Sequence, residues 1–217
     1  MIFPVSLFKM EGYMEQTLVM KELCRQRFQP AVDKVKELLE SDNGCIVVAI
    51  DGMSASGKST LGCYLKELFE CNLFHMDDFF LQDNQRTEER LAEVGGNVDY
   101  ERFREEVLQP LSEKDMVVYR PFRCNIRAIE GETKIAFKRL NIIEGSYSQH
   151  PYFENVYDNK QMYVYRIFTE IPEELQMERI RNRNGEVMLK RFIAEWIPKE
   201  NAYFEKFQIK QNSDMVL

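Results

Sequence analysis

The chain has 217 residues, of which 44% are hydrophobic, enough to build one globular domain around a substantial core. Its net charge of −7 and pI near 5.1 argue against a nucleic-acid-binding protein, because such proteins usually present a basic surface. No segment reaches the roughly 18 apolar residues that cross a membrane, and the apolar start lacks a basic leader, so we expect a cytoplasmic protein. The five cysteines show no metal-ligand spacing and are expected to be reduced, mostly buried thiols.

The first part of the chain is predicted to be helical. Glu15–Glu40 carry apolar residues at helical spacing, and Pro30 is expected to break the pattern or to start a second helix. The sequence Ser-Asp-Asn-Gly at residues 41–44 is a helix stop signal. We therefore expect residues 1–43 to form a helical segment packed on the core domain of residues 44–217.

A strand, a glycine-rich turn and a helix are predicted in direct succession. The apolar run Cys45–Asp51 predicts a buried strand, and Leu61–Glu70 have helical spacing. Between them, residues 52–59 fit the pattern G-x-x-x-x-G-K-[ST], in which loop N–H groups and a helix N-terminus face a phosphate. The residues expected to bind a nucleoside triphosphate are Gly52, Ser54, Ala55, Ser56, Gly57, Lys58, Ser59 and Thr60. Lys58 should reach the β- and γ-phosphates, and the Ser59 hydroxyl should ligate Mg²⁺.

The rest of the chain alternates between predicted strands and helices. Strands are expected near residues 72–77, 140–144, 162–169 and 214–217, and helices near 99–111, from 171 onward, at 187–196 and at 199–207. Residues 116–119 and 133–137 are expected to pair as a hairpin, within a small insert over about 116–138. The alternation predicts an α/β domain with a mainly parallel sheet.

Acidic residues follow several of these predicted strands. Because ligands of such sheets sit beyond the carboxyl ends of the strands, Asp51, the glycine-rich loop, Asp77 and Glu144 are expected to border one crevice. Asp77 could accept the proton of an acceptor hydroxyl and approach Mg²⁺, with Asp78 as its rival. Glu144 could hold the same ion. Each carboxylate could instead serve only as a cap or a strand-end group.

Other polar and aromatic residues suggest a lid and an acceptor pocket. A basic stretch over about 179–191 could close over a triphosphate and stabilise transition-state charge, or could be a solvated helix face. Its members are Arg179, Arg181, Arg183, Lys190 and Arg191. Asp99 could bind ribose hydroxyls or cap a helix. Tyr119, Phe122 and Arg123 could line a pocket for a planar base or could pack the hairpin.

With these residues in place, the chain resembles the uridine kinase-like branch of P-loop kinases, relatives of phosphoribulokinase and bacterial pantothenate kinase. The resemblance runs from about Ile46 to Leu217. It is carried by AIDGMSASGKSTL (49–61), FHMDDFFL (74–81), GGNVDYERF (95–103), VYRPFRC (118–124), NIIEGSYSQHPYF (141–153), YD (157–158) and RFIAEWIPKENAYF (191–204). It implies the three-layer sandwich of P-loop NTPases with a hairpin insert and a basic lid, and it implies the use of ATP and Mg²⁺.

The resemblance also implies roles for single residues. Asp77 would be the catalytic base, Asp99 would bind ribose, and Glu144 would hold Mg²⁺ with Ser59 and Asp77. Lys58 and the lid arginines Arg179 and Arg183 would assist transfer, and Arg181 would contact the nucleotide. Two features depart from the family. The element D-S-F-Y is replaced by Asp77-Asp78-Phe79-Phe80, and the base-contacting histidine has no clear counterpart.

Three functional hypotheses follow. The first is an ATP-dependent kinase of the 5′-hydroxyl of uridine or cytidine, and the second is a kinase of another small alcohol or nucleoside. The third is a catalytically silent ATP sensor. A GTPase is disfavoured because residues 159–162, Asn-Lys-Gln-Met, lack the aspartate of N-K-x-D and because no D-x-x-G element follows the loop. We expect a small-molecule acceptor and neither a nucleic-acid nor a membrane partner, and we leave a homo-oligomer open.

Overall fold

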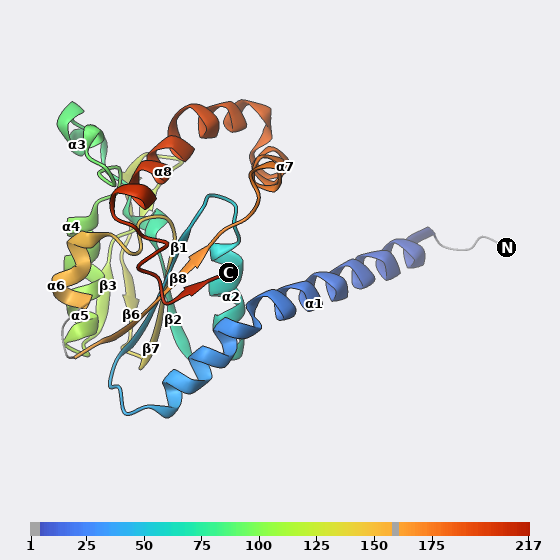
Figure 1. Cartoon of the computed structure of the whole chain (residues 1–217), viewed down its shortest axis with the longest axis horizontal. Helices are drawn as coiled ribbons and strands as arrows, with labels where there is room; N and C mark the ends of the chain where they lie inside the picture. Colours follow the sequence, from blue (N-terminus) through green and yellow to red (C-terminus); the bar gives the residue numbers. More distant parts are fainter. Residues whose placement is uncertain (1–4, 158–160) are drawn as a thin grey trace.

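The computed structural model describes residues 5–157 and 161–217, with the side chains of residues 5–21 and of Cys24 left out. Asp158, Asn159 and Lys160, which belong to two of the sequence patterns above, lie outside the described residues. A five-stranded sheet is the centre of the fold (Figure 1). Its strands are β1 (Ile46–Gly52), β2 (Cys71–His75), β7 (Leu140–Glu144), β8 (Tyr163–Thr169) and β9 (Met215–Val216).

The strands run in the order β2-β7-β1-β8-β9, and every neighbouring pair is parallel. Central strand β1 lies between β7 and β8, with Val48 opposite Ile142 on one side and Tyr165 on the other. The predicted α/β class with a mainly parallel sheet is confirmed. All five carboxyl ends therefore face the same edge of the sheet, where ligands of such folds bind.

One face of the sheet is covered by α1 (Val5–Glu40) and α2 (Lys58–Leu68). Alternate residues of a strand point to the same face, so Ile46 and Ile50 of β1 pack with Val32 and Val35 of α1 in one buried cluster. Burial of each such side chain contributes about 1.5–3 kcal/mol to folding. This packing brings the C-terminal part of α1 against the sheet.

The opposite face is covered by shorter helices. These are α4 (Tyr100–Phe103), the π-helical turn Arg104–Leu108, α5 (Gln109–Ser112), α6 (Glu154–Tyr157) and α8 (Ile197–Lys206). Cys45 and Val47, which alternate with the residues of the first face, share a buried cluster with Phe103, Leu108 and Tyr203. The sheet and its two helical layers form the expected three-layer sandwich.

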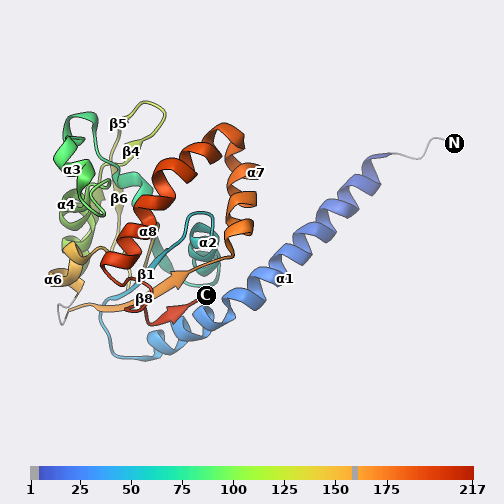
Figure 2. The ribbon, with the colours of Figure 1, turned by 45° about the horizontal axis from the view of Figure 1, so that its top comes forward.

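Helix α1 runs uninterrupted through Pro30, so the prediction that this proline breaks or starts a helix is wrong. A proline inside a helix costs about 3 kcal/mol. Its neighbours Phe28, Ala31 and Val32 are all buried, and their packing against the domain offsets that cost. Toward its N-terminus, α1 extends away from the domain (Figures 1 and 2).

The predicted hairpin is present. Strand β3 (Val117–Tyr119) pairs antiparallel with β6 (Thr133–Ile135), and between them β4 (Phe122–Arg123) pairs antiparallel with β5 (Ala128–Ile129). The polar segment before Asn97 contains the 3-10 turn η2 (Asp83–Gln85) and the short helix α3 (Glu88–Ala92). These elements lie beside the carboxyl edge of the sheet (Figure 2).

The basic stretch belongs to helix α7 (Glu173–Arg191), which begins after Pro172, close to the helix predicted from residue 171 onward. Gly185 interrupts it with φ 80° and ψ 170°, a conformation that glycine adopts at low cost. A π-helical turn, Phe192–Trp196, then leads into α8. The predicted helices at 187–196 and 199–207 are therefore parts of one continuous helical segment after this interruption.

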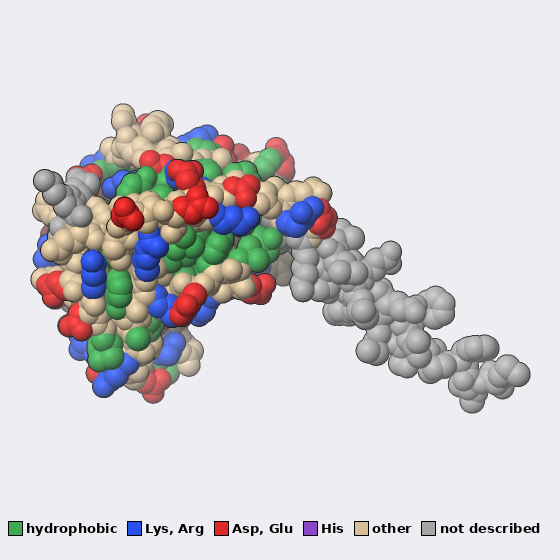
Figure 3. Space-filling model, turned by 90° about the horizontal axis from the view of Figure 1, so that it is seen from below, with side chains coloured by type: hydrophobic (Ala, Val, Ile, Leu, Met, Phe, Trp, Pro, Cys, Tyr) green, Lys and Arg blue, Asp and Glu red, His purple; other side chains and the backbone are tan. Residues whose placement is uncertain are grey.

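Acidic and basic side chains are interspersed over the face shown in Figure 3, with hydrophobic side chains between them. In the ranges 5–157 and 161–217, no helix is long and apolar enough to cross a membrane. Of the cysteines with described side chains, Cys45 and Cys71 are buried whereas Cys63 and Cys124 are exposed. The expectation of mostly buried thiols is thus correct for two of these four residues.

Candidate active site

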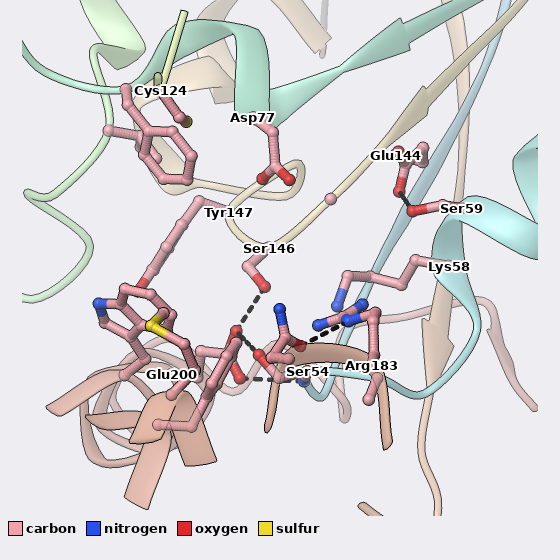
Figure 4. A pocket seen from close by; sticks show the side chains of 18 of the residues that line it. Ser54, Lys58, Ser59, Asp77, Cys124, Glu144, Ser146, Tyr147, Arg183 and Glu200 are labelled. Atoms are coloured by element: carbon pink, nitrogen blue, oxygen red, sulfur yellow. Dashed lines mark hydrogen bonds between the residues drawn. The ribbon is translucent and has the colours of Figure 1, made fainter. Parts of the chain in front are cut away.

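A cavity of about 1250 Å³ opens beside the glycine-rich loop. Its walls come from α1, the glycine-rich loop, η1 (Met76–Phe79), the hairpin insert, the segment after β7, α7 and α8. Lys58, Ser59, Asp77 and Glu144 all border it, as the strand-end argument predicted (Figure 4). The structure therefore brings the proposed phosphate-binding and acidic residues together.

The glycine-rich loop owes its shape to left-handed backbone conformations. Gly52 has φ 134°, and a Cβ atom there would lie 2.1 Å from the carbonyl oxygen of Thr169. Gly57 has φ 106° and directly precedes α2. The first N–H groups of a helix have no partner within that helix, so the start of α2 offers amides to an anion. Only glycine meets both requirements without strain or collision.

Lys58 and Ser59 stand at the start of α2. The Lys58 ammonium donates to the carbonyl oxygens of Gly52 and Met53, at 2.8 and 2.9 Å. The Ser59 hydroxyl donates to Glu144 Oε2 at 3.0 Å. The loop thus holds its own lysine in place and links its serine to the acid at the end of β7.

Glu144 is buried and shared between two elements. Its second oxygen, Oε1, lies 2.5 Å from His75 Nδ1, and this hydrogen bond raises the pKa of His75 above its usual range. Ser59, Asp77 and Glu144 together offer one hydroxyl and two carboxylates to the same cavity. Mg²⁺ prefers such hard oxygen donors, so the donor set fits the ion.

The structure separates the two candidate bases. Strand β2 ends at His75, so Asp77 does not directly end the strand as predicted but lies in the 3-10 turn η1. Asp77 borders the cavity, and burial raises its pKa, with a further contribution from the Glu144 charge. Asp78 instead accepts a hydrogen bond from the Tyr119 hydroxyl at 3.2 Å. Of the two acids, only Asp77 lines the cavity.

Asp99 is engaged elsewhere. It is only 3% exposed and caps α4 by accepting from the Arg102 backbone N–H at 3.1 Å. Its other oxygen accepts from Arg102 Nε at 3.1 Å and from Gln85 Nε2 at 3.0 Å. The predicted cap is present, and these contacts occupy the carboxylate that the resemblance assigns to ribose.

Only part of the proposed base pocket borders the cavity. Phe122 borders the cavity together with Phe80, Cys124 and Tyr147. Tyr119 is buried in the core cluster, and Arg123 is exposed on β4; neither borders the cavity. The cavity therefore presents aromatic side chains together with Asp77, and its lining also includes Arg86 and Arg127.

Among the lid arginines, Arg179, Arg183 and Arg191 border the cavity. Arg179 donates to the carbonyl oxygen of Ala55 at 3.1 Å, which places its charge on the glycine-rich loop. Arg181 lies outside the lining and pairs with Glu186 at 2.9 Å on the exposed side of α7. Helical geometry explains the separation, because residues two apart point to different faces.

Asp51 was expected at the same crevice but is fully buried beneath it. Its carboxylate accepts from the backbone N–H groups of Gly52, Tyr147 and Gln149 and from the Tyr203 hydroxyl. Burial raises the pKa of Asp51 to about 6. The residue anchors the loop after β7 to the end of β1.

Two residues that the sequence did not single out hold the glycine-rich loop. Glu200 of α8 is buried and accepts from the Ser54 N–H at 3.0 Å and from the Ser54 and Ser146 hydroxyls at 2.7 Å each (Figure 4). Gln176 of α7 donates to the Ser54 carbonyl oxygen at 3.1 Å. The segment RFIAEWIPKENAYF contains Glu200, but no local pattern pairs it with a residue 146 positions away.

We expect Glu200→Ala to lower the free energy of unfolding by about 1–3 kcal/mol, because Ser54 and Ser146 would lose their buried acceptor. Urea denaturation followed by circular dichroism measures the change. Glu205→Ala is the matched control, since Glu205 is exposed on the same helix. Equal stability of the two variants would show that the Glu200 contacts contribute little to holding the loop.

No family model matches the chain, and no curated protein matches it in sequence. Solved structures do match it. One, described as a possible uridine kinase from Bacillus stearothermophilus, superimposes with a TM-score of 0.61 at 18% identity over 88% of this chain and 99% of that one. Another, a putative fructose transport system kinase from Silicibacter sp. TM1040, gives 0.61 at 19% identity over 82% and 91%.

The chain has the P-loop kinase fold. The likeness covers nearly the full length of both solved structures. At 18% and 19% identity, the likeness shows the fold alone.

Proposed function

We propose that the protein is a kinase that transfers the γ-phosphate of ATP to a hydroxyl group of a small molecule, with Mg²⁺. One observation carries the proposal: the P-loop, the Ser59–Glu144 pair and the carboxylate of Asp77 all border a single cavity. A loop that only bound a nucleotide would not need an acid facing an aromatic surface beside it. Phosphoryl transfer needs these groups together.

Each residue has a role in the proposed reaction. The P-loop residues Gly52–Thr60 bind the phosphates, and Lys58 stabilises charge on the β- and γ-phosphates. Asp77 accepts the proton of the acceptor hydroxyl while the hydroxyl oxygen forms a bond to the γ-phosphorus. The bond between the γ-phosphorus and the β–γ bridging oxygen breaks, and ADP is released. Arg179 and Arg183 add positive charge near the transferring group.

Mg²⁺, held by Ser59, Glu144 and Asp77, would neutralise charge on the β- and γ-phosphate oxygens. Asp77 would then serve both the ion and the acceptor. The contact of Arg181 with the nucleotide remains a prediction. In the structure, the Arg181 guanidinium pairs with Glu186 on the outer side of α7.

Uridine or cytidine is the acceptor favoured by the family resemblance and by the likeness to a structure described as a possible uridine kinase. A second candidate, another small alcohol, is favoured by the geometry. Asp99, which would bind ribose, is occupied by Arg102 and Gln85, and both Tyr119 and Arg123 lie off the cavity. Another matching structure is described as a putative fructose transport system kinase.

ADP release from Mg·ATP across a panel of acceptors tests the proposal. The panel comprises uridine, cytidine, adenosine, guanosine, pantothenate, ribulose 5-phosphate, glycerate and no acceptor. Acceleration by a panel member supports a kinase, and acceleration by uridine or cytidine alone supports the first candidate. ATP binding without any acceptor-dependent release would argue for a sensor.

A further inference from the structure

Helix α1 contributes to the cavity, although it precedes the P-loop strand and is unrelated to the phosphate-binding pattern. Leu23, Arg27 and Phe28 border the same cavity as the P-loop. Figures 1 and 2 show α1 running beside α2, the helix that starts at Lys58. Phe28 and Tyr64 of α2 are in aromatic contact, with ring centroids 6.2 Å apart.

Arg27 is held directly against the P-loop. Its Nη1 atom lies 3.4 Å from the point where a Cβ atom on Gly57 would stand. Its Nη2 atom donates to the carbonyl oxygens of Glu170 at 3.2 Å and Leu217 at 3.5 Å, beyond the ends of β8 and β9. The guanidinium is therefore fixed in position by the domain rather than swinging on a surface side chain.

The proposed acceptor site at Asp77 and the hairpin insert lies on the opposite side of the domain from α1 (Figure 2). Asp77 and Cys124 are at one end of the view in Figure 4, and Arg183 of α7 is at the other. If the γ-phosphate meets the acceptor at Asp77, the rest of the nucleotide must extend away from that carboxylate. Helices α1 and α7 lie on that opposite side of the domain (Figure 2), and they border the cavity with Leu23, Arg27, Arg179, Asn182 and Arg183.

We propose that α1 forms one wall of the site for the nucleotide base, with the Arg27 guanidinium stacked on a purine ring and Leu23 packed against it. This inference rests on the proposed use of ATP. A planar guanidinium stacks well on an aromatic face, and it does so best where it is held in place. Leu23 is 54% exposed, an unfavourable state for an apolar side chain that a bound base would relieve.

Isothermal titration calorimetry of ATP and of inorganic tripolyphosphate, each with Mg²⁺, tests the inference on the full chain. Tripolyphosphate has the phosphates but lacks the base. Arg27→Ala is expected to weaken ATP about tenfold, the equivalent of roughly 1.4 kcal/mol, and tripolyphosphate less than twofold. Arg25→Ala is the matched control, since Arg25 lies two residues away on the same helix and pairs with Glu22 at the exposed surface; it should leave both affinities unchanged.

Leu23→Ser provides a second test that does not disturb the Arg27 hydrogen bonds, and it should weaken ATP about threefold without affecting tripolyphosphate. Equal weakening of both ligands by Arg27→Ala would overturn the inference, because Arg27 would then act on the phosphates or on the fold. An unchanged ATP affinity in both variants would also overturn it. These outcomes concern binding alone, so they are distinct from a failure to find acceptor-dependent ADP release.

Discussion

Lys58→Ala is expected to lower kcat/KM for ATP-dependent phosphorylation by at least about 10³-fold. The substitution removes a charge from the β- and γ-phosphates, and loss of even one preorganised donor commonly costs about 10²–10³ in rate. Acceptor-dependent ADP release measures the effect, with any panel member that the wild-type protein phosphorylates. The Lys58 ammonium already lies within the loop, bonded to the Gly52 and Met53 carbonyl oxygens, so little reorganisation is needed.

Lys66→Ala is the matched control for this variant. Lys66 lies in the last turn of the same helix and is exposed. It should retain wild-type turnover, and circular dichroism should show both variants folded. A folded Lys58→Ala variant with more than a tenth of wild-type kcat/KM would contradict the assigned role of the loop.

Asp77→Asn is expected to lower kcat by about 10²-fold or more while the dissociation constant for ATP changes less than twofold. An amide cannot accept the hydroxyl proton, and general base catalysis contributes about 10²–10⁴. Single-turnover kinetics measure the chemical step, and calorimetry measures ATP binding. Rate and binding are expected to separate because the asparagine oxygen can still ligate Mg²⁺ together with Ser59 and Glu144, whereas it cannot act as the base.

Asp78→Asn is the matched control for this variant. Asp78 is adjacent in sequence but bonds the Tyr119 hydroxyl, so we expect less than a tenfold fall in kcat. If the two variants showed the opposite pattern, the base would be Asp78. If neither changed kcat, general base catalysis by this element would be excluded.

Local sequence information was enough for the P-loop and for the sheet. The strand before Gly52 is buried on both faces, so its apolar run is continuous, and the glycines stand where the backbone needs positive φ. Capping chemistry is equally local, which is why the cap at Asp99 and the helix start after Pro172 were predictable. Such features depend on residues within a few positions of one another.

Pairings across long separations were not predictable in this way. Pro30 lies within a helix because its neighbours pack on a sheet whose strands all come later in the sequence. The separation of Asp77 from Asp78 depends on a hairpin about 40 residues further on, where Tyr119 bonds one of the two acids. Arg181 and Arg179 look alike in sequence, yet only the latter borders the cavity.

A phosphate-binding loop on a parallel α/β sheet could be recognised from the order of residues alone, because that loop is built from consecutive residues whose backbone conformations are set locally. The surroundings of the loop became visible only in the folded chain. Glu200 reaches Ser54 from α8, and Arg27 reaches Gly57 from α1. Both contacts arise because helices on different faces of the sheet meet at its carboxyl edge, a meeting that depends on packing across the whole domain.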